Sequence, residues 1–90
     1  MFDTTHYEDK VPERLLVGLI AWGKQHHPVG DFLTAVLKND LFEAVARADY
    51  HSIVALKWIV MFVHNELPGK CHGSPEHVKK WIEQMEATVE

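Results

Sequence analysis

Apolar residues recur at the three-and-four spacing of a helix along most of this chain, and residues that cap or end helices interrupt the pattern. The first run begins near Pro12, since proline suits the first helical position. It ends near His26, because Pro28 disfavours helical geometry at the residue before it. The pattern predicts an all-α fold: a compact bundle of four to five short helices around a central apolar helix.

The segment VGDFLTAVLKNDLFEAVARAD has apolar positions that suit one long helix, yet Asn39 and Asp40 stand in its middle. Asp40 and Glu43 have the spacing of a capping box, in which a side chain at the helix start accepts a backbone N–H three residues on. A break there predicts short helices over 30–38 and 40–49. The alternative is a single helix with two solvated polar residues on its outer face.

The most apolar segment of the chain follows this run. It predicts one helix from Asp49 or Ser52 to about Asn65. Because this helix is apolar nearly all round, it is either the central helix or carries an interface on one face. Residues 67–75 are predicted to form a loop from their proline and glycine content, and the Ser-Pro pair at the loop's end starts the last helix.

A chain of 90 residues is expected to form one domain. Residues 1–10 show no periodicity and predict a loose N-terminal arm, tied down by Phe2 and Tyr7, while residues 11–90 form a single helical domain. A domain of this size buries only a little over ~60% of its unfolded surface, yet 47% of its residues are hydrophobic. We therefore expect part of the apolar surface to meet another subunit, in a homo-oligomer, or a partner.

The formal charge of −4 and the lack of a Lys and Arg stripe argue against a duplex-DNA partner. The N-terminus has acidic residues where a signal peptide would be basic. The longest nearly apolar stretch falls well short of the ~20 residues of a membrane span. With Cys71 as the lone cysteine, the sequence predicts a cytoplasmic protein without a membrane partner.

No residue pattern typical of catalysis or metal binding stands out. His26 and His27 are adjacent, which on a helix would point them about 100° apart, a poor start for a metal site. Cys71 and His72 are also adjacent, and neighbouring side chains rarely present a nucleophile and its base to one substrate. We therefore expect no enzyme activity, no metal and no cofactor, with Cys71 as an ordinary buried cysteine.

One candidate ligand site lies in the loop before the last helix. Lys70, His72 and Ser74 stand there with two glycines, directly before a helix N-terminus. Free backbone N–H groups and the helix dipole favour an anion at such a position. Routine capping of the helix would explain the same residues.

A second candidate site involves Arg47, Asn39 and Asp40. Asp40 and Arg47 are two helical turns apart and would share one face. An arginine among alanines and valines can pair with a buried carboxylate at a pocket, and Trp22 or Trp58 could stack on a ligand base. The alternative is a solvated salt bridge, worth well under ~1 kcal/mol.

The motif PxGxFLxAVLxNDLxEAxxRAD, together with the CxGSP of residues 71–75, resembles a group of small proteins encoded by bacteriophages and prophages. The resemblance covers about residues 11–82. It supplies a biological context without binding residues or a mechanism. This chain departs from the group's pattern at Asp31, where the group has a second glycine after Gly30, and the extra carboxylate counts against an anion at that helix end.

The phage context implies action by stoichiometric binding. In the first hypothesis a homo-oligomer sequesters a small anionic, nucleotide-derived ligand to counter host defence in the host cytosol, and Lys70, His72 and Ser74 hold its phosphate. In the second, the protein is an interaction inhibitor or adaptor that docks on a host protein through its apolar and acidic surface. A nucleotide-directed enzyme that uses Cys71 is a remote third.

Overall fold

The computed structural model describes residues 2–89, and the side chains of residues 2–84. Residues 2–89 form helices and connecting turns with no strand, which confirms the predicted all-α bundle. The elements in chain order are α1 (Glu13–Gln25), α2 (Asp31–Leu37), α3 (Leu41–Arg47), α4 (Tyr50–Val54), α5 (Leu56–Glu66), the short 3₁₀ helix η1 (Gly69–Cys71) and α6 (Pro75–Val89).

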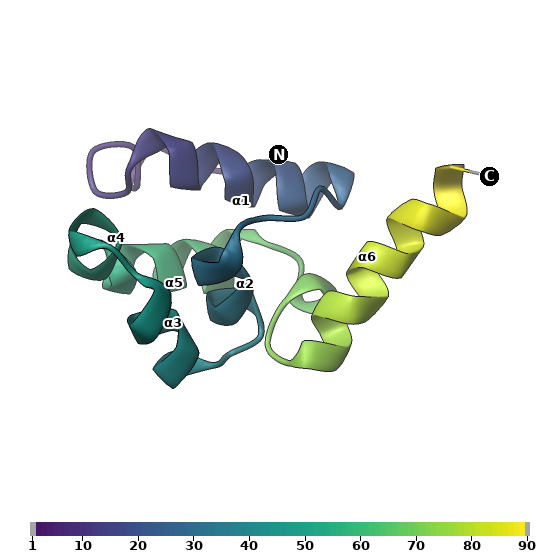
Figure 1. Cartoon of the computed structure of the whole chain (residues 1–90). Coiled ribbons are helices and arrows are strands. Elements are labelled where there is room, and N and C mark those ends of the chain that lie inside the picture. Colours follow the sequence, from purple (N-terminus) through teal and green to yellow (C-terminus); the bar gives the residue numbers. More distant parts are fainter. Residues whose placement is uncertain (1, 90) are drawn as a thin grey trace.

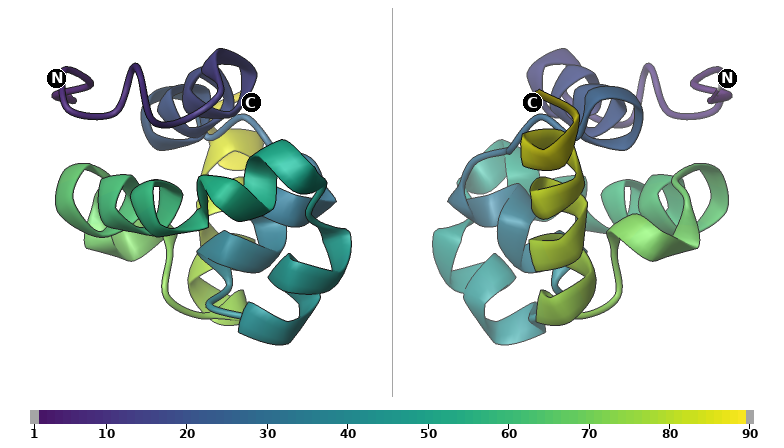
Figure 2. Two further views of the ribbon diagram at one scale, coloured as in Figure 1. Left: turned by 90° about the vertical axis from the view of Figure 1, so that its left-hand side faces the viewer. Right: turned by 90° about the vertical axis from the view of Figure 1, so that its right-hand side faces the viewer.

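The helices are arranged with α3, α4 and α5 at one end of the molecule and α6 at the other (Figure 1). Helix α1 lies along the top of the bundle in that view, and α2 lies beneath it. The two side views of Figure 2 agree, since α3, α4 and α5 face the viewer on the left and α6 faces the viewer on the right. Helix α6 packs against η1 and α2. The α3 to α5 end is therefore left without a helix packed on its outer side.

The predicted break at Asn39 and Asp40 is confirmed. Helix α2 ends at Leu37, and Asn39 adopts the left-handed backbone, with φ 62°. Asparagine tolerates this conformation better than most residues. Asp40 then caps α3, because its Oδ1 accepts the backbone N–H of Glu43 at 3.2 Å.

The prediction of one helix from Asp49 or Ser52 to Asn65 is wrong, because Ala55 divides this segment into α4 and α5. Ala55 has φ −90° and ψ 0°, a turn conformation. Its small side chain is buried, so the chain can turn inside the core. Because neither proline nor glycine stands there, the division between α4 and α5 could not be predicted.

The core is drawn mainly from α1, α2, α5 and η1, and it also includes Tyr7 and Val11 of the N-terminal segment and Val78 and Trp81 of α6. Its fully buried side chains are Leu19, Trp22, Leu37, Ile59, Phe62 and Cys71. Helix α5 contributes an inner face only, because Val60 on its other side is 47% exposed. The segment was predicted either to be the central helix or to carry an interface on one face. Its inner face belongs to the core, and its outer face is left exposed.

Two tryptophans, Trp22 and Trp81, join α1 to η1 and α6 through hydrogen bonds. The indole N–H of Trp22 donates to the carbonyl of Cys71 at 3.0 Å, and that of Trp81 donates to the carbonyl of Trp22 at 2.6 Å. The ring of His26 stacks on Trp81 with 3.9 Å between centroids. Because a buried indole N–H without a partner is costly, these bonds fix η1 and α6 against α1.

The N-terminal arm packs on α5. The ring of Tyr7 is buried and meets Phe62 edge to face, with 5.1 Å between centroids. Its hydroxyl accepts a hydrogen bond from Asn65 Nδ2 at 3.3 Å. Phe2 also meets Phe62 edge to face, at 6.4 Å. The two aromatic residues singled out in the sequence are therefore the ones that contact the bundle.

Candidate functional site

A groove of about 330 Å³ runs between α3 and α5 and ends at the loop before α6. Its walls are mostly apolar, and its polar lining residues are Asn39, Asp40, His64 and His72. We call it the α3/α5 groove, lined by Val36, Asn39, Asp40, Leu41, Ala44, Leu56, Val60, Val63, His64, His72 and Gly73. Small-molecule and peptide-anchor sites of proteins have this size and composition.

Three residues singled out in the sequence line this groove: Asn39, Asp40 and His72. They come together because the N–H of Gly73 donates to the carbonyl of Leu37 at 2.7 Å, which ties the loop before α6 to the end of α2. Gly73 itself has φ 106°, a conformation that side chains oppose. The helix break and the loop thus form one wall, although they lie far apart in the sequence.

His72 is the partly buried titratable group of this wall. Its Nε2 is buried without a hydrogen-bond partner. Burial lowers the pKa of His72, the Leu67 backbone opposes this shift, and the neighbouring His64 and His77 add to it. The imidazole is therefore mostly neutral at pH 7. Among the described residues that line the groove, Asp40 is the acidic one, and none is a lysine or an arginine.

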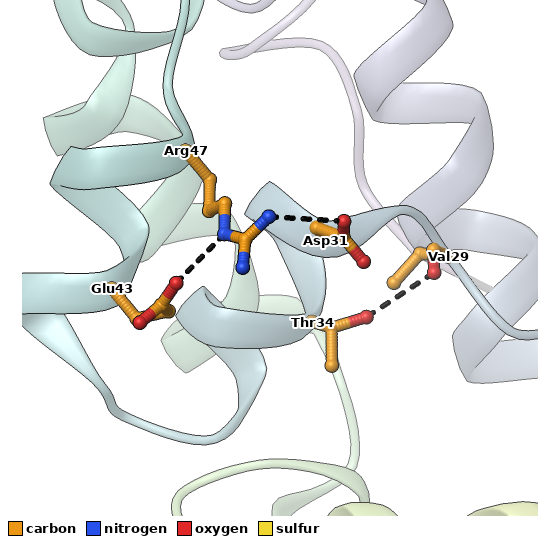
Figure 3. A network of polar contacts seen from close by, with 5 residues as sticks. All are labelled: Val29, Asp31, Thr34, Glu43 and Arg47. Carbon is orange, nitrogen blue, oxygen red and sulfur yellow. Dashed lines mark hydrogen bonds and ion pairs between the residues drawn. The ribbon is translucent and has the colours of Figure 1, made fainter.

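Arg47 lies away from the groove, on the side of α3 that faces α2 (Figure 3). Its Nε donates to Glu43 Oε1 at 2.7 Å, and its Nη1 lies 3.5 Å from Asp31 Oδ2. The hydrogen bond with Glu43 raises the pKa of Arg47, and the charges of Glu43 and Asp31 add to this. All three side chains are about half exposed or more. Of the two predictions for Arg47, the solvated salt bridge is the one that the structure shows.

A second, wider depression of about 520 Å³ lies beside Arg47, between α1 and α2. Arg14 also lines it, and its Nη2 pairs with Asp49 Oδ2 at 3.0 Å. Each arginine of this depression therefore has a carboxylate partner. An anionic ligand would have to displace these carboxylates before it could use either guanidinium group.

The residues predicted to hold a phosphate do not converge. Lys70 is exposed in η1 and is not among the residues that line the groove. The Oγ of Ser74 accepts the backbone N–H of His77 at 3.2 Å, so this hydroxyl caps α6. Trp22 is only 1% exposed, and a ligand base could stack on it only if the core opened.

The side chain of Cys71 is fully buried in the core. Burial raises the pKa of the Cys71 thiol to about 11. Because the thiolate is the nucleophilic form, the geometry gives this cysteine no route to a substrate. The part of the chain that the structure describes also brings together no group of three His, Cys, Asp or Glu side chains suited to a metal ion.

Most apolar residues of α3 are left outside the core. Ala44 is the buried residue of α3, whereas Leu41 is 62% and Phe42 is 87% exposed. Leu41 borders the groove and Phe42 lies outside it, because the core cannot cover both faces of a helix of only two turns. Hydrophobic spacing identified the helix correctly, but it did not show which apolar face would stay open.

Comparison with known proteins adds no relative to this picture. The chain matches no protein-family model, no curated protein and no solved structure. Within residues 2–89, no helix is both long and apolar enough to cross a membrane. The α3/α5 groove and the surface around it are therefore the features that bear on function.

Proposed function

We propose that this protein acts by stoichiometric binding, and that the α3/α5 groove receives an apolar segment of a partner protein, in the manner of an inhibitor or adaptor. The groove is partly open to solvent and has mostly apolar walls, which suits the side chains of an amphipathic helix or an extended peptide. Leu41 and Val60 stand on its two sides and would make the first contacts.

The observation that carries this proposal is the exposed apolar rim of the groove. Leu41 is 62% exposed and Val60 is 47% exposed, and both line the groove. A small ligand inside the groove would leave much of these two side chains uncovered. Exposed apolar side chains that continue from a groove are characteristic of surfaces that bind other proteins.

Sequestration of a small anionic ligand has less support from the same geometry. The groove offers the carboxylate of Asp40, the imidazole of His64 and the imidazole of His72, whose charged form is disfavoured by burial, but it offers no lysine or arginine to a phosphate. The cationic side chains of Arg14 and Arg47 are already paired with carboxylates elsewhere. A neutral ligand with an apolar body would suit the groove better than a nucleotide.

The resemblance to phage proteins sets the expected context, in which the partner is a host protein in the cytosol. The net charge of −4 favours a partner whose docking surface is basic, because complementary charge speeds encounter. Since that contribution is screened by salt, the association rate should fall as ionic strength rises.

The test is capture of partners from host cells by tagged wild-type protein and by two variants, followed by mass spectrometry. Val60→Glu places a charge on the wall of the groove. Val17→Glu is the matched control, because Val17 is also a well-exposed valine but lies on α1, outside the groove. Both variants should keep the wild-type helix content and melting temperature.

We expect one protein to be captured in near-equal amount by the wild type and by Val17→Glu, and to be lost with Val60→Glu. Capture that is equal with both variants would show that the groove is not the docking site. Native mass spectrometry of the same preparations tests the alternative, since a small molecule retained by the wild type and lost in Val60→Glu would replace the protein partner in this proposal.

A further inference from the structure

Exposed apolar side chains are concentrated in one part of this molecule. Of the large apolar side chains that are exposed among the described residues, seven lie in the twenty residues from 41 to 60, and the other is Val17. Two of the seven, Leu41 and Val60, line the groove. The other five form what we call the outer apolar surface: Phe42, Val45, Tyr50, Ile53 and Val54.

These five side chains come from two consecutive helices on the same side of the molecule. Phe42 and Val45 are three residues apart on α3, and Tyr50, Ile53 and Val54 have the three-and-four spacing of one face of α4. Both helices belong to the face turned to the viewer in the left panel of Figure 2, away from α6. The surface is therefore accessible to another molecule.

The exposed area is what a dimer of small proteins requires. At the exposed fractions of Phe42 and Tyr50, the two rings alone leave about 300 Å² of apolar surface in water. With the three aliphatic residues the total is on the order of 500 Å². A standard interface buries about 800 Å² on each partner, and roughly 65% of a homodimer interface is apolar, which is again about 500 Å².

The charged residues of α3 and of the start of α4 are paired, so they do not oppose the approach of a second copy. Beside Tyr50 and Val54 lie the acidic Glu8, Asp9 and Glu13, with Lys10 among them. On α3, Glu43 and Arg47 neutralise each other through the contact of 2.7 Å between them. At the start of α4, Asp49 is paired with Arg14 of α1 at 3.0 Å. Although the whole chain carries a charge of −4, Glu43 and Asp49 are each paired within their own copy, so neither would face the second copy as an unpaired charge.

We infer that the outer apolar surface joins two copies of this chain in a two-fold symmetric dimer. The same five residues of each copy meet those of the other, as a closed two-fold interface requires. Because Leu41 and Val60 stay outside this contact, the dimer carries two grooves and can bind a partner at two points. The inference concerns self-association and does not depend on what the groove binds.

The experiment is sedimentation equilibrium of the full chain over a wide range of concentration, at moderate salt. The double variant Phe42→Lys with Tyr50→Lys places two positive charges in the outer apolar surface. Both residues are well exposed, so the fold should persist, which the circular dichroism spectrum would verify. Val17→Lys is the matched control, and Val60→Glu tests the groove separately.

We expect the wild type, Val17→Lys and Val60→Glu to sediment at twice the monomer mass, and the double variant at the monomer mass. A wild type that stays monomeric up to millimolar concentration would overturn the inference, and so would a dimer that survives in the double variant. The groove proposal is tested independently, since Val60→Glu should lose the captured partner while remaining a dimer.

Discussion

Asp40→Ala should destabilise the fold by about 1 kcal/mol, because it removes the cap of α3. The lost contact is the hydrogen bond from the Glu43 N–H to Asp40 Oδ1, whose length of 3.2 Å is at the weak end of the usual range. Helix α3 has only seven residues and buries little beyond Ala44, so packing cannot compensate for a frayed first turn. For a domain of this size, about 1 kcal/mol corresponds to a fall in melting temperature of roughly 4–8 °C.

The assay is thermal and urea denaturation followed by circular dichroism, with Asp40→Asn as the control. Asparagine keeps a side-chain oxygen for the Glu43 N–H, so its cost should be only a few tenths of a kcal/mol. Asp49→Ala should cost more than Asp40→Ala, because Asp49 accepts the Ser52 N–H at 2.8 Å and also holds Arg14. A loss near zero for Asp40→Ala, or equal losses for the alanine and asparagine variants, would refute the capping argument.

Three further predictions concern single residues. Asn39→Ala should cost about 1 kcal/mol in urea denaturation, because φ is 62° there, whereas Asn39→Gly should be neutral within error; equal losses would contradict the backbone argument. Folding raises the pKa of Cys71 from near 9.0 to about 11, so the stability of the wild type should fall as the pH rises between these values, and Cys71→Ala should lack this additional fall. Cys71 in the native protein should also react with a thiol reagent far more slowly at pH 8 than Cys71 in the unfolded chain. Equal reaction rates would refute its burial. Because folding lowers the pKa of His72, that residue should cost stability as the pH falls below 6.5, so the melting temperature of His72→Gln should decrease less between pH 7.5 and 5.5 than that of the wild type.

Most of the helix positions could be predicted from the sequence. Pro12 and Pro28 bracket α1, and the Asp40 and Glu43 pair correctly placed the start of α3. These signals act within one or two helical turns, through local backbone geometry and hydrogen bonds. The division at Ala55 escaped prediction, because a buried alanine in a turn conformation is decided by the packing around it.

The candidate site was predictable only in part. Asn39, Asp40 and His72 do line the groove, but Lys70 and Ser74 do not, although they flank His72 in the sequence. Neighbours in a loop point in different directions, and their direction is set by contacts such as the bond between Gly73 and Leu37. The sequence could suggest a polar loop, but not which of its side chains would face a cavity.

Local signals in the sequence predicted a helical chain, bracketed its first helix and indicated a helix break at Asn39 and Asp40, and its composition predicted more apolar surface than so small an interior needs. These properties follow from local backbone preferences and from composition. The tertiary structure alone decided that Phe42 and Tyr50 are the apolar residues left outside, and that α3, α5 and the loop at Gly73 enclose a groove. The physical reason is that burial depends on which helix faces meet, and those contacts join residues that are distant in the sequence.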